Sequence, residues 1–158
     1  MCSGSSLPTA RPRAAPNPAS PGATDIDLSD VPGDLRRAVG AALHAAGVSD
    51  GHIGLQIVGE GRMRTLNYAA RGVDEATDVL AFPIDPVITG GSSPSAAEPP
   101  RIRDTGPREL GDVFICPEKA TDVTEAAVHG ALHLCGYDHE SDGGEMLELQ
   151  ARVMASLR

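Results

Sequence analysis

The stretch His129-Gly-Ala-Leu-His133-Leu-Cys-Gly136-Tyr-Asp-His139 places three of the five histidines of the chain within eleven residues. His129 and His133 are four residues apart, so on a helix their rings project from one face. Gly136 can adopt the left-handed conformation that ends a helix. The chain then turns back, and His139 can reach the same point. The stretch therefore predicts a helix end that gathers three imidazoles around one metal ion.

Three neutral imidazoles suit zinc, and three protein ligands leave a fourth position open for water. An open position favours catalysis over a purely structural site. Cys135 follows His133 by two positions and lies roughly 200° around the helix from it, so we interpret Cys135 as a packed thiol. Nickel and cobalt also suit imidazole. The pattern thus predicts one transition-metal ion per chain, with zinc as the first choice.

The spacing His-x3-His-x2-Gly-x2-His is also that of the metzincin peptidases. Those enzymes carry their general base, a glutamate, directly after the first histidine. Here that position is Gly130. Two interpretations stay open at this point. Either another residue activates the water of a zinc-dependent peptidase, or the substrate is different.

The composition excludes several classes of protein. With 13 Lys and Arg against 22 Asp and Glu, the formal charge is −9, so any contact with nucleic acid must be local. Two Tyr, two Phe and no Trp argue against an RNA-binding sheet of stacked rings. Three scattered cysteines argue against a disulfide scaffold. No apolar run reaches the ~18 residues of a membrane span and no secretory leader is visible, so we expect a cytoplasmic protein without membrane contact.

Composition also divides the chain. Residues 1–24 are rich in Pro, Ala, Ser and Gly and predict a disordered tail, which leaves residues 25–158 as the domain. Within that domain, residues 84–108 are again rich in Pro, Gly and Ser and predict a long flexible loop.

Hydrophobic spacing predicts the elements of the domain. A first helix opens at Asp30-Val-Pro32 and closes at Gly47. Alternating apolar residues predict strands over 53–57, 78–82 and 112–116, and helical spacing predicts helices over about 63–70, 124–135 and 144–157. This mixture indicates an α+β or α/β domain. We take α+β, a small mixed sheet packed with helices and a zincin-like three-histidine site at a helix end.

The histidine stretch resembles the signature of the YbeY endoribonucleases, bacterial ribosomal RNA maturation factors, throughout residues 129–139. A second block of that family resembles Leu66-Asn67, Arg71-Gly72 and Thr77-Asp78-Val79-Leu80-Ala81-Phe82-Pro83, with Ala81 for a serine. A third resembles Leu110-Gly111-Asp112-Val113-Phe114-Ile115. Three blocks in the same order are far more specific than the histidines alone.

The resemblance implies a zinc-dependent, single-strand-specific endoribonuclease in 3′-end maturation of small-subunit ribosomal RNA and in ribosome quality control. Its partners would be the precursor RNA, small-subunit proteins and an assembly GTPase, and not DNA. It maps the zinc ligands onto His129, His133 and His139 and a functional arginine onto Arg71. A non-catalytic ribosome-assembly factor stabilised by zinc is a further alternative.

Several other polar residues are candidates with two interpretations each. From the residues alone Arg71 is a surface arginine that the helix dipole favours. The resemblance instead implies that Arg71 is catalytic, and its guanidinium offers a planar fork of donors to phosphate. Asn67 is a candidate for substrate binding, or else it orients Arg71. Arg62 and Arg64 are candidates for substrate binding, or else solvated surface charges. Asp138 is a candidate to orient a histidine, or else it caps a turn. Because acidic residues crowd the last helix, we expect weak, salt-sensitive RNA binding through the Arg62–Arg71 side.

Overall fold

The structure is a computed structural model that describes residues 25–84 and 108–158. The predicted tail and nearly all of the predicted loop lie outside the described residues. The elements in chain order are β1 (Asp25–Asp27), α1 (Arg36–Ala45), β2 (Asp50–Ile57), α2 (Glu60–Arg71), β3 (Val79–Pro83), β4 (Glu109–Ile115), α3 (Val123–Leu134) and α4 (Glu145–Ser156). None of these helices is long and apolar enough to cross a membrane.

The strands form a four-stranded sheet in the order β1-β2-β4-β3. β2 pairs in parallel with both β1 and β4, whereas β3 pairs antiparallel with β4. The sheet is therefore mixed and β3 is one of its edges. Together with the four helices, this confirms the α+β prediction.

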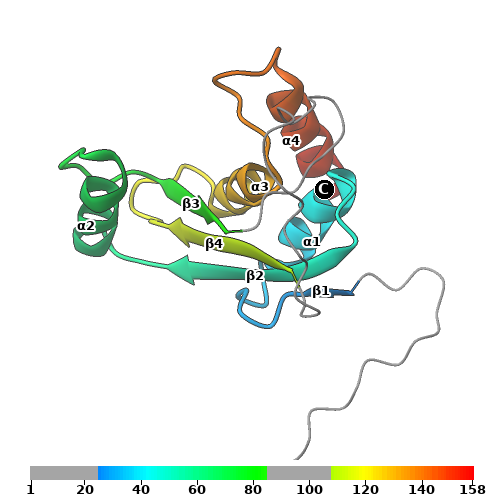
Figure 1. The fold of residues 1–158 in the computed structure, drawn as a ribbon, viewed down its shortest axis with the longest axis horizontal. Coiled ribbons are helices and arrows are strands. Elements are labelled where there is room, and N and C mark those ends of the chain that lie inside the picture. Colours follow the sequence, from blue (N-terminus) through cyan, green and yellow to red (C-terminus); the bar gives the residue numbers. More distant parts are fainter. Residues whose placement is uncertain (1–24, 85–107) are drawn as a thin grey trace, which may run out of the picture.

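Three helices pack together on one face of the sheet, as Figure 1 shows. α3 lies directly on β3 and β4, and α1 and α4 contact α3 and each other. Val113 and Ile115 of β4 point into this core and are fully buried. The alternate residue Phe114 packs in a second, smaller cluster instead. Side chains on a strand alternate between its faces, so β4 separates the two clusters.

α2 lies at one end of the sheet, apart from the other helices (Figure 1). Its buried Met63 packs with Leu80 and Cys116 in the smaller cluster. Phe82 and Phe114 meet edge to face in the same cluster, with ring centroids 5.6 Å apart. The helix ends at Gly72, whose φ of 72° is left-handed, and this stop fixes where Arg71 emerges.

Close contact between α3 and the sheet depends on Gly130. A Cβ added there would lie 2.5 Å from Cγ1 of Val113 and 3.2 Å from Cγ2 of Val79. Real Cβ atoms do not approach so closely, because interiors are close-packed. The position that holds the glutamate in metzincins is therefore pressed against the sheet, and a glutamate side chain has no room there.

Several details of the elements differ from the sequence-based expectation. α1 begins at Arg36 and not near Pro32, since residues around Asp34 form a turn in which the Leu35 amide bonds to the Pro32 carbonyl at 2.9 Å. α2 begins earlier than expected, at Glu60. β1 was not predicted, because three residues carry too little pattern. Ile57, the last residue of β2, is 46% exposed and lies outside the core.

Candidate metal centre

The helix that carries the first two histidines is capped at both ends. At its N-terminus the Asp122 carboxylate accepts from the backbone amides of Thr124 and Glu125 at 2.8 and 3.1 Å. At its C-terminus Gly136 is left-handed with a φ of 90°, as the sequence predicts. The chain reverses there and carries His139 back toward the helix.

His129, His133 and His139, the histidine trio, come together at this reversal. Each offers a ring nitrogen, and these three atoms all lie within 4.8 Å of one another. The ring centroids are 4.7, 5.1 and 5.3 Å apart. The predicted cluster is confirmed as one that could hold a metal ion.

The hydrogen bonds of two rings fix which nitrogen faces the cluster. Nδ1 of His133 lies 2.9 Å from the backbone carbonyl of Tyr137, and Nδ1 of His129 lies 2.8 Å from the side-chain Oε1 of Gln150. Both partners are carbonyl oxygens, which accept and do not donate. Each Nδ1 therefore carries the proton, and each Nε2 of the neutral ring is an unprotonated ligand atom.

The arrangement of these ligand atoms fits a bound cation. The Nε2 atoms of His129 and His133 are 3.1 Å apart, close to the ~3.3 Å that two nitrogens take around a tetrahedral zinc. Without a cation their lone pairs would face each other. Burial, and next the His129 ring, lowers the pKa of His133, which keeps that ring neutral. The donor set thus suits a transition metal.

Cys135 lies outside this donor set. Its thiol is fully buried, and burial raises its pKa to about 12. A thiol with such a pKa stays protonated and does not act as a thiolate ligand. The prediction of a packed thiol is confirmed.

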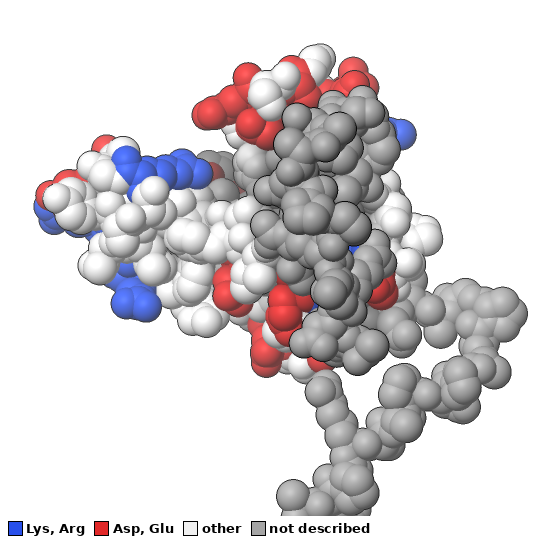
Figure 2. Space-filling model, viewed as in Figure 1, with Lys and Arg blue, Asp and Glu red and all other residues white. Residues whose placement is uncertain are grey.

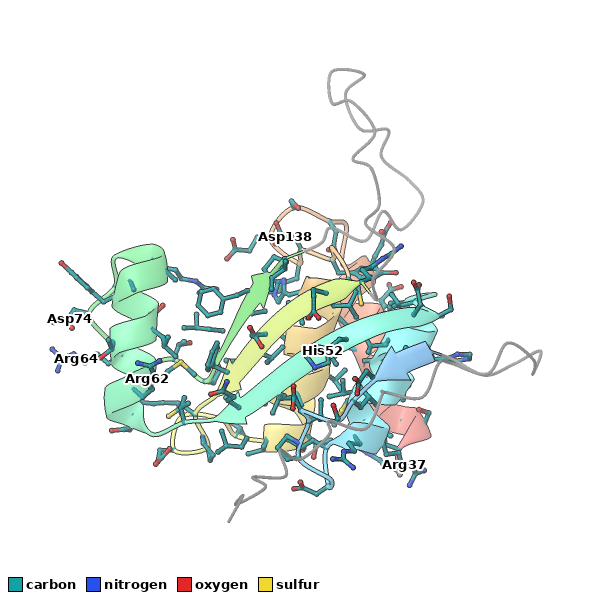
Figure 3. The ribbon with its side chains drawn as sticks, turned by 60° about the horizontal axis from the view of Figure 1, so that its bottom comes forward. Arg37, His52, Arg62, Arg64, Asp74 and Asp138 are labelled. Carbon is teal, nitrogen blue, oxygen red and sulfur yellow. The ribbon has the colours of Figure 1, made fainter. Side chains whose placement is uncertain are left out.

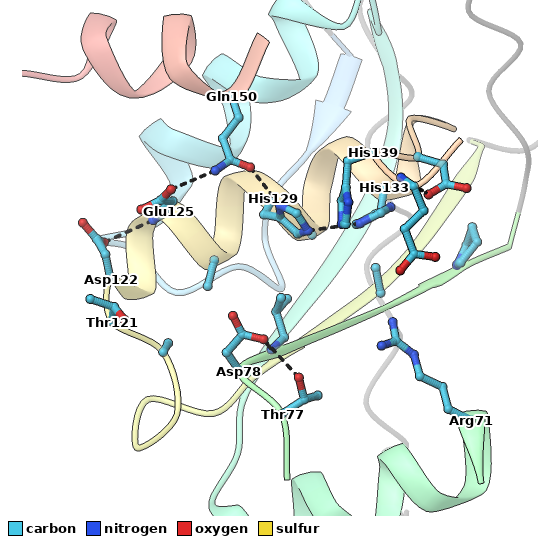
Figure 4. A pocket seen from close by; sticks show the side chains of 18 residues that line it. Arg71, Thr77, Asp78, Thr121, Asp122, Glu125, His129, His133, His139 and Gln150 are labelled. Carbon is cyan, nitrogen blue, oxygen red and sulfur yellow. Dashed lines mark hydrogen bonds between the residues drawn. The ribbon is translucent and has the colours of Figure 1, made fainter. Parts of the chain in front are cut away.

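A cleft of about 900 Å³ opens beside the trio. Arg71 lines it from the end of α2, and Figure 4 shows this side chain across the cleft from the histidines. Among the described residues that line the cleft, Arg71 is the one Lys or Arg. The carboxylates that line it are those of Asp78, Asp122, Glu125, Asp138 and Glu140. An anionic ligand would therefore meet its attraction at Arg71 and at the metal position.

The structure does not bring the tentative substrate-binding residues into this cleft. Nε and Nη2 of Arg64 donate to the two carboxylate oxygens of Asp74, each at 2.7 Å, and this pair is exposed (Figure 3). Asn67 is 4% exposed and donates from Nδ2 to the Glu75 carbonyl at 2.8 Å, so it braces the segment after α2. Arg62 is exposed on α2. Substrate binding by these three residues stays a prediction.

The observed contacts of Asp138 are those of a residue that caps a turn. Its carboxylate accepts from the Glu140 amide at 3.1 Å and from the Ser141 hydroxyl at 3.0 Å. These bonds, the Glu140 amide first, lower the pKa of Asp138. The Nδ1 protons of His129 and His133 go to other acceptors. The described contacts therefore give Asp138 the role of holding the turn that presents His139.

Sequence reasoning missed two residues that act on the trio, Gln150 and Glu125. Gln150 is 8% exposed on α4 and bonds both to His129 and to Glu125. One signal was available. Gln150 interrupts the apolar stripe of α4, where Met146, Leu149 and Val153 are all buried, and a polar residue in such a stripe needs a partner.

The chain is similar to proteins of one described family. The profile of the family described as Endoribonuclease YbeY matches residues 23–158. The chain is 33% identical over 131 residues to an Endoribonuclease YbeY of Nitratiruptor sp., covering 83% of this chain and 82% of that one. It is 36% identical over 149 residues to an Endoribonuclease YbeY of Bradyrhizobium sp., covering 83% and 81%. A solution structure from Thermotoga maritima is 25% identical, with a TM-score of 0.43, over 75% of this chain and 77% of that one.

Proposed function

The chain belongs to the Endoribonuclease YbeY family, and from this premise we propose that it is a zinc-dependent endoribonuclease specific for single-stranded RNA. We place its activity in the cytoplasm, in 3′-end maturation of small-subunit ribosomal RNA and in ribosome quality control. The observation that supports this most is the position of Arg71, which α2 brings to the cleft that the trio lines. A phosphate-binding fork and a metal position then share one cavity.

The residues of the cleft divide the work of phosphodiester hydrolysis. A zinc ion held by His129, His133 and His139 would supply a Lewis acid for a phosphoryl oxygen and a bound water of lowered pKa. Arg71 binds the phosphate and stabilises the charge that develops on its oxygens. The carboxylates of the cleft repel an RNA backbone, so productive binding depends on Arg71.

Charge on the surface indicates the path of the RNA. Figure 2 shows blue Lys and Arg atoms around α2, beside a few red Asp and Glu atoms, whereas the segment that leads into α4 carries red atoms. An RNA strand would therefore approach over α2, with its scissile phosphate at Arg71. Such a small basic surface on a chain of net charge −9 gives weak binding that falls steeply with salt.

The test compares zinc-loaded wild type, Arg71→Ala and Arg71→Lys on single-stranded and duplex RNA that carries the small-subunit 3′ precursor sequence. We expect cleavage of the single strand alone, about 100-fold slower for Arg71→Ala, with zinc content unchanged. Arg37→Ala, an exposed arginine on α1, is the matched control and should cleave at the wild-type rate. Full activity of Arg71→Ala would contradict the assigned role. Cleavage of a denatured protein in place of RNA would indicate a peptidase, and rescue of ribosome assembly without any cleavage would indicate a structural factor.

A further inference from the structure

We propose that Gln150 and Glu125 are a matched positioning pair that fixes the tautomer and orientation of His129 and thereby sets the metal affinity of the trio. The inference rests on the proposed metal-dependent function. It goes further, because neither residue belongs to the ligand set of the trio. It concerns a relay between two helices, from the Glu125 carboxylate through the Gln150 amide to the His129 ring (Figure 4).

The direction of the relay follows from the groups at its two ends. Nε2 of Gln150 lies 2.9 Å from Oε1 of Glu125. An ionised carboxylate only accepts hydrogen bonds, so the amide NH2 must face Glu125 and the amide oxygen must face His129. That oxygen lies 2.8 Å from Nδ1 of the ring. Glu125 thus prevents the amide from turning over, and Gln150 holds the proton of His129 on Nδ1.

The two ligand histidines on α3 obtain the same tautomer by different means. His133 donates to the backbone carbonyl of Tyr137, an acceptor that no substitution of a side chain removes. His129 depends on a side chain from another helix. Gln150 is 8% exposed, and its replacement by an apolar side chain would leave the Nδ1 proton of His129 without this acceptor. Of these two ligands, His129 is therefore the one whose orientation depends on a side chain that a substitution can remove.

Charge explains why the pair is one amide and one carboxylate. Glu125 stands in the first turn of α3, where the helix dipole favours a negative charge. A glutamate at 150 would put a second carboxylate at the present 2.9 Å contact, and one of the two would have to move or take up a proton. Exchanging the two residues preserves the relay. The carboxylate at 150 then accepts from His129, and the amide at 125 donates to it.

The experiment measures zinc affinity by competition with a chromogenic chelator for wild type, Gln150→Leu, Gln150→Glu, Glu125→Gln and the exchanged double variant. Outer-shell partners of ligand histidines are typically worth about 10- to 100-fold in metal affinity, and we expect a loss of that size for Gln150→Leu. Gln150→Glu should also lose affinity. The double variant Glu125→Gln/Gln150→Glu should return to within a few-fold of wild type. Gln56→Glu, an exposed glutamine on β2, is the control for the charge change and should bind zinc as wild type does.

A second readout separates positioning from stability. In the metal-free protein, ¹⁵N NMR of the histidine rings should show His129 protonated at Nδ1 in wild type and in the double variant, but a mixture of tautomers in Gln150→Leu. Wild-type affinity in Gln150→Leu, or a double variant no better than Gln150→Glu, would overturn the inference while leaving the nuclease proposal intact. A wild type that binds no zinc would instead overturn the proposed function itself.

Discussion

The histidines on the two faces of the sheet have opposite surroundings. At the cleft, His129 and His133 give their Nδ1 protons to neutral carbonyl oxygens and turn their Nε2 atoms toward each other. On the face away from α3, His52 has a carboxylate at each ring nitrogen, Glu109 at 2.8 Å and Asp30 at 3.0 Å (Figure 3). The bond to Glu109, with a smaller contribution from Asp30, raises the pKa of His52. Carbonyl acceptors therefore leave an imidazole neutral and able to bind a metal, whereas neighbouring carboxylates favour its protonated form.

The largest effect should come from removing one ligand of the trio. In His133→Ala we expect zinc affinity to fall about 60- to 700-fold, because about 10–16 kcal/mol shared by four ligands in structural zinc sites is about 2.5–4 kcal/mol each, and 1.4 kcal/mol is tenfold. Chelator competition measures this loss. His52→Ala is the matched control from the other face and should keep the wild-type zinc affinity. Equal losses of zinc affinity in both variants would contradict the assignment of the metal site to the trio.

The next effect comes from disturbing the close contact between α3 and the sheet at Gly130. Gly130→Ala should lower the free energy of unfolding by about 1–3 kcal/mol, as overpacking does, because its Cβ would meet Val113 at 2.5 Å. Gly61→Ala, in α2 with nothing within 4 Å of its added Cβ, is the control and should be neutral or stabilising by up to about 1 kcal/mol. Urea denaturation measures both. Equal stability of the two variants would show that α3 can shift without cost.

A smaller effect concerns the contribution of His52 to stability and its dependence on pH. Because the pKa of His52 is raised on folding, its stabilising contribution is fully present below the unfolded value of about 6.5 and is lost as pH rises through the folded value. The carboxylates are 68% and 51% exposed, so solvent screening limits the contribution to about 1 kcal/mol or less. The difference in unfolding free energy between wild type and His52→Asn should shrink from pH 6 to 8.5, with chelator present. A difference constant over this range would contradict the assignment.

The smallest effect is the difference between Glu109 and Asp30 in how much each raises the pKa of His52. Glu109→Gln should lower the pKa of His52 more than Asp30→Asn does, since the Glu109 bond is the shorter one and contributes most to the shift. An NMR titration of the His52 ring resonances in each variant measures this order directly. The reverse order would mean that Asp30 is the main partner.

The sequence predicted what one segment determines by itself. The trio lies on one helix and the turn after it, so spacing and Gly136 were sufficient, and the packed Cys135 followed from the same helical geometry. Arg71 was different. Its place in the cleft depends on how α2 meets the sheet, which local pattern does not encode, and the resemblance to a known family supplied it.

Contacts between distant elements were missed for the same reason. The bond from Gln150 to His129 joins α4 to α3, and the three-residue β1 pairs with β2, which lies more than twenty residues later in the chain. Spacing in the chain predicts which face of an element a residue occupies, and it does not predict which other element will cover that face.

The place of β4 in the sheet has a consequence for how the chain folds during synthesis. β4 pairs with β2 on one side and β3 on the other, in a register that joins His52 to Glu109. Until β4 has left the ribosome, the described part of the chain offers β3 no strand to pair with, and β2 has three residue pairs with β1. Such non-local pairing delays folding. The nascent chain must therefore wait for β4 before its sheet can close, and the cleft beside the trio is assembled only after that strand is made.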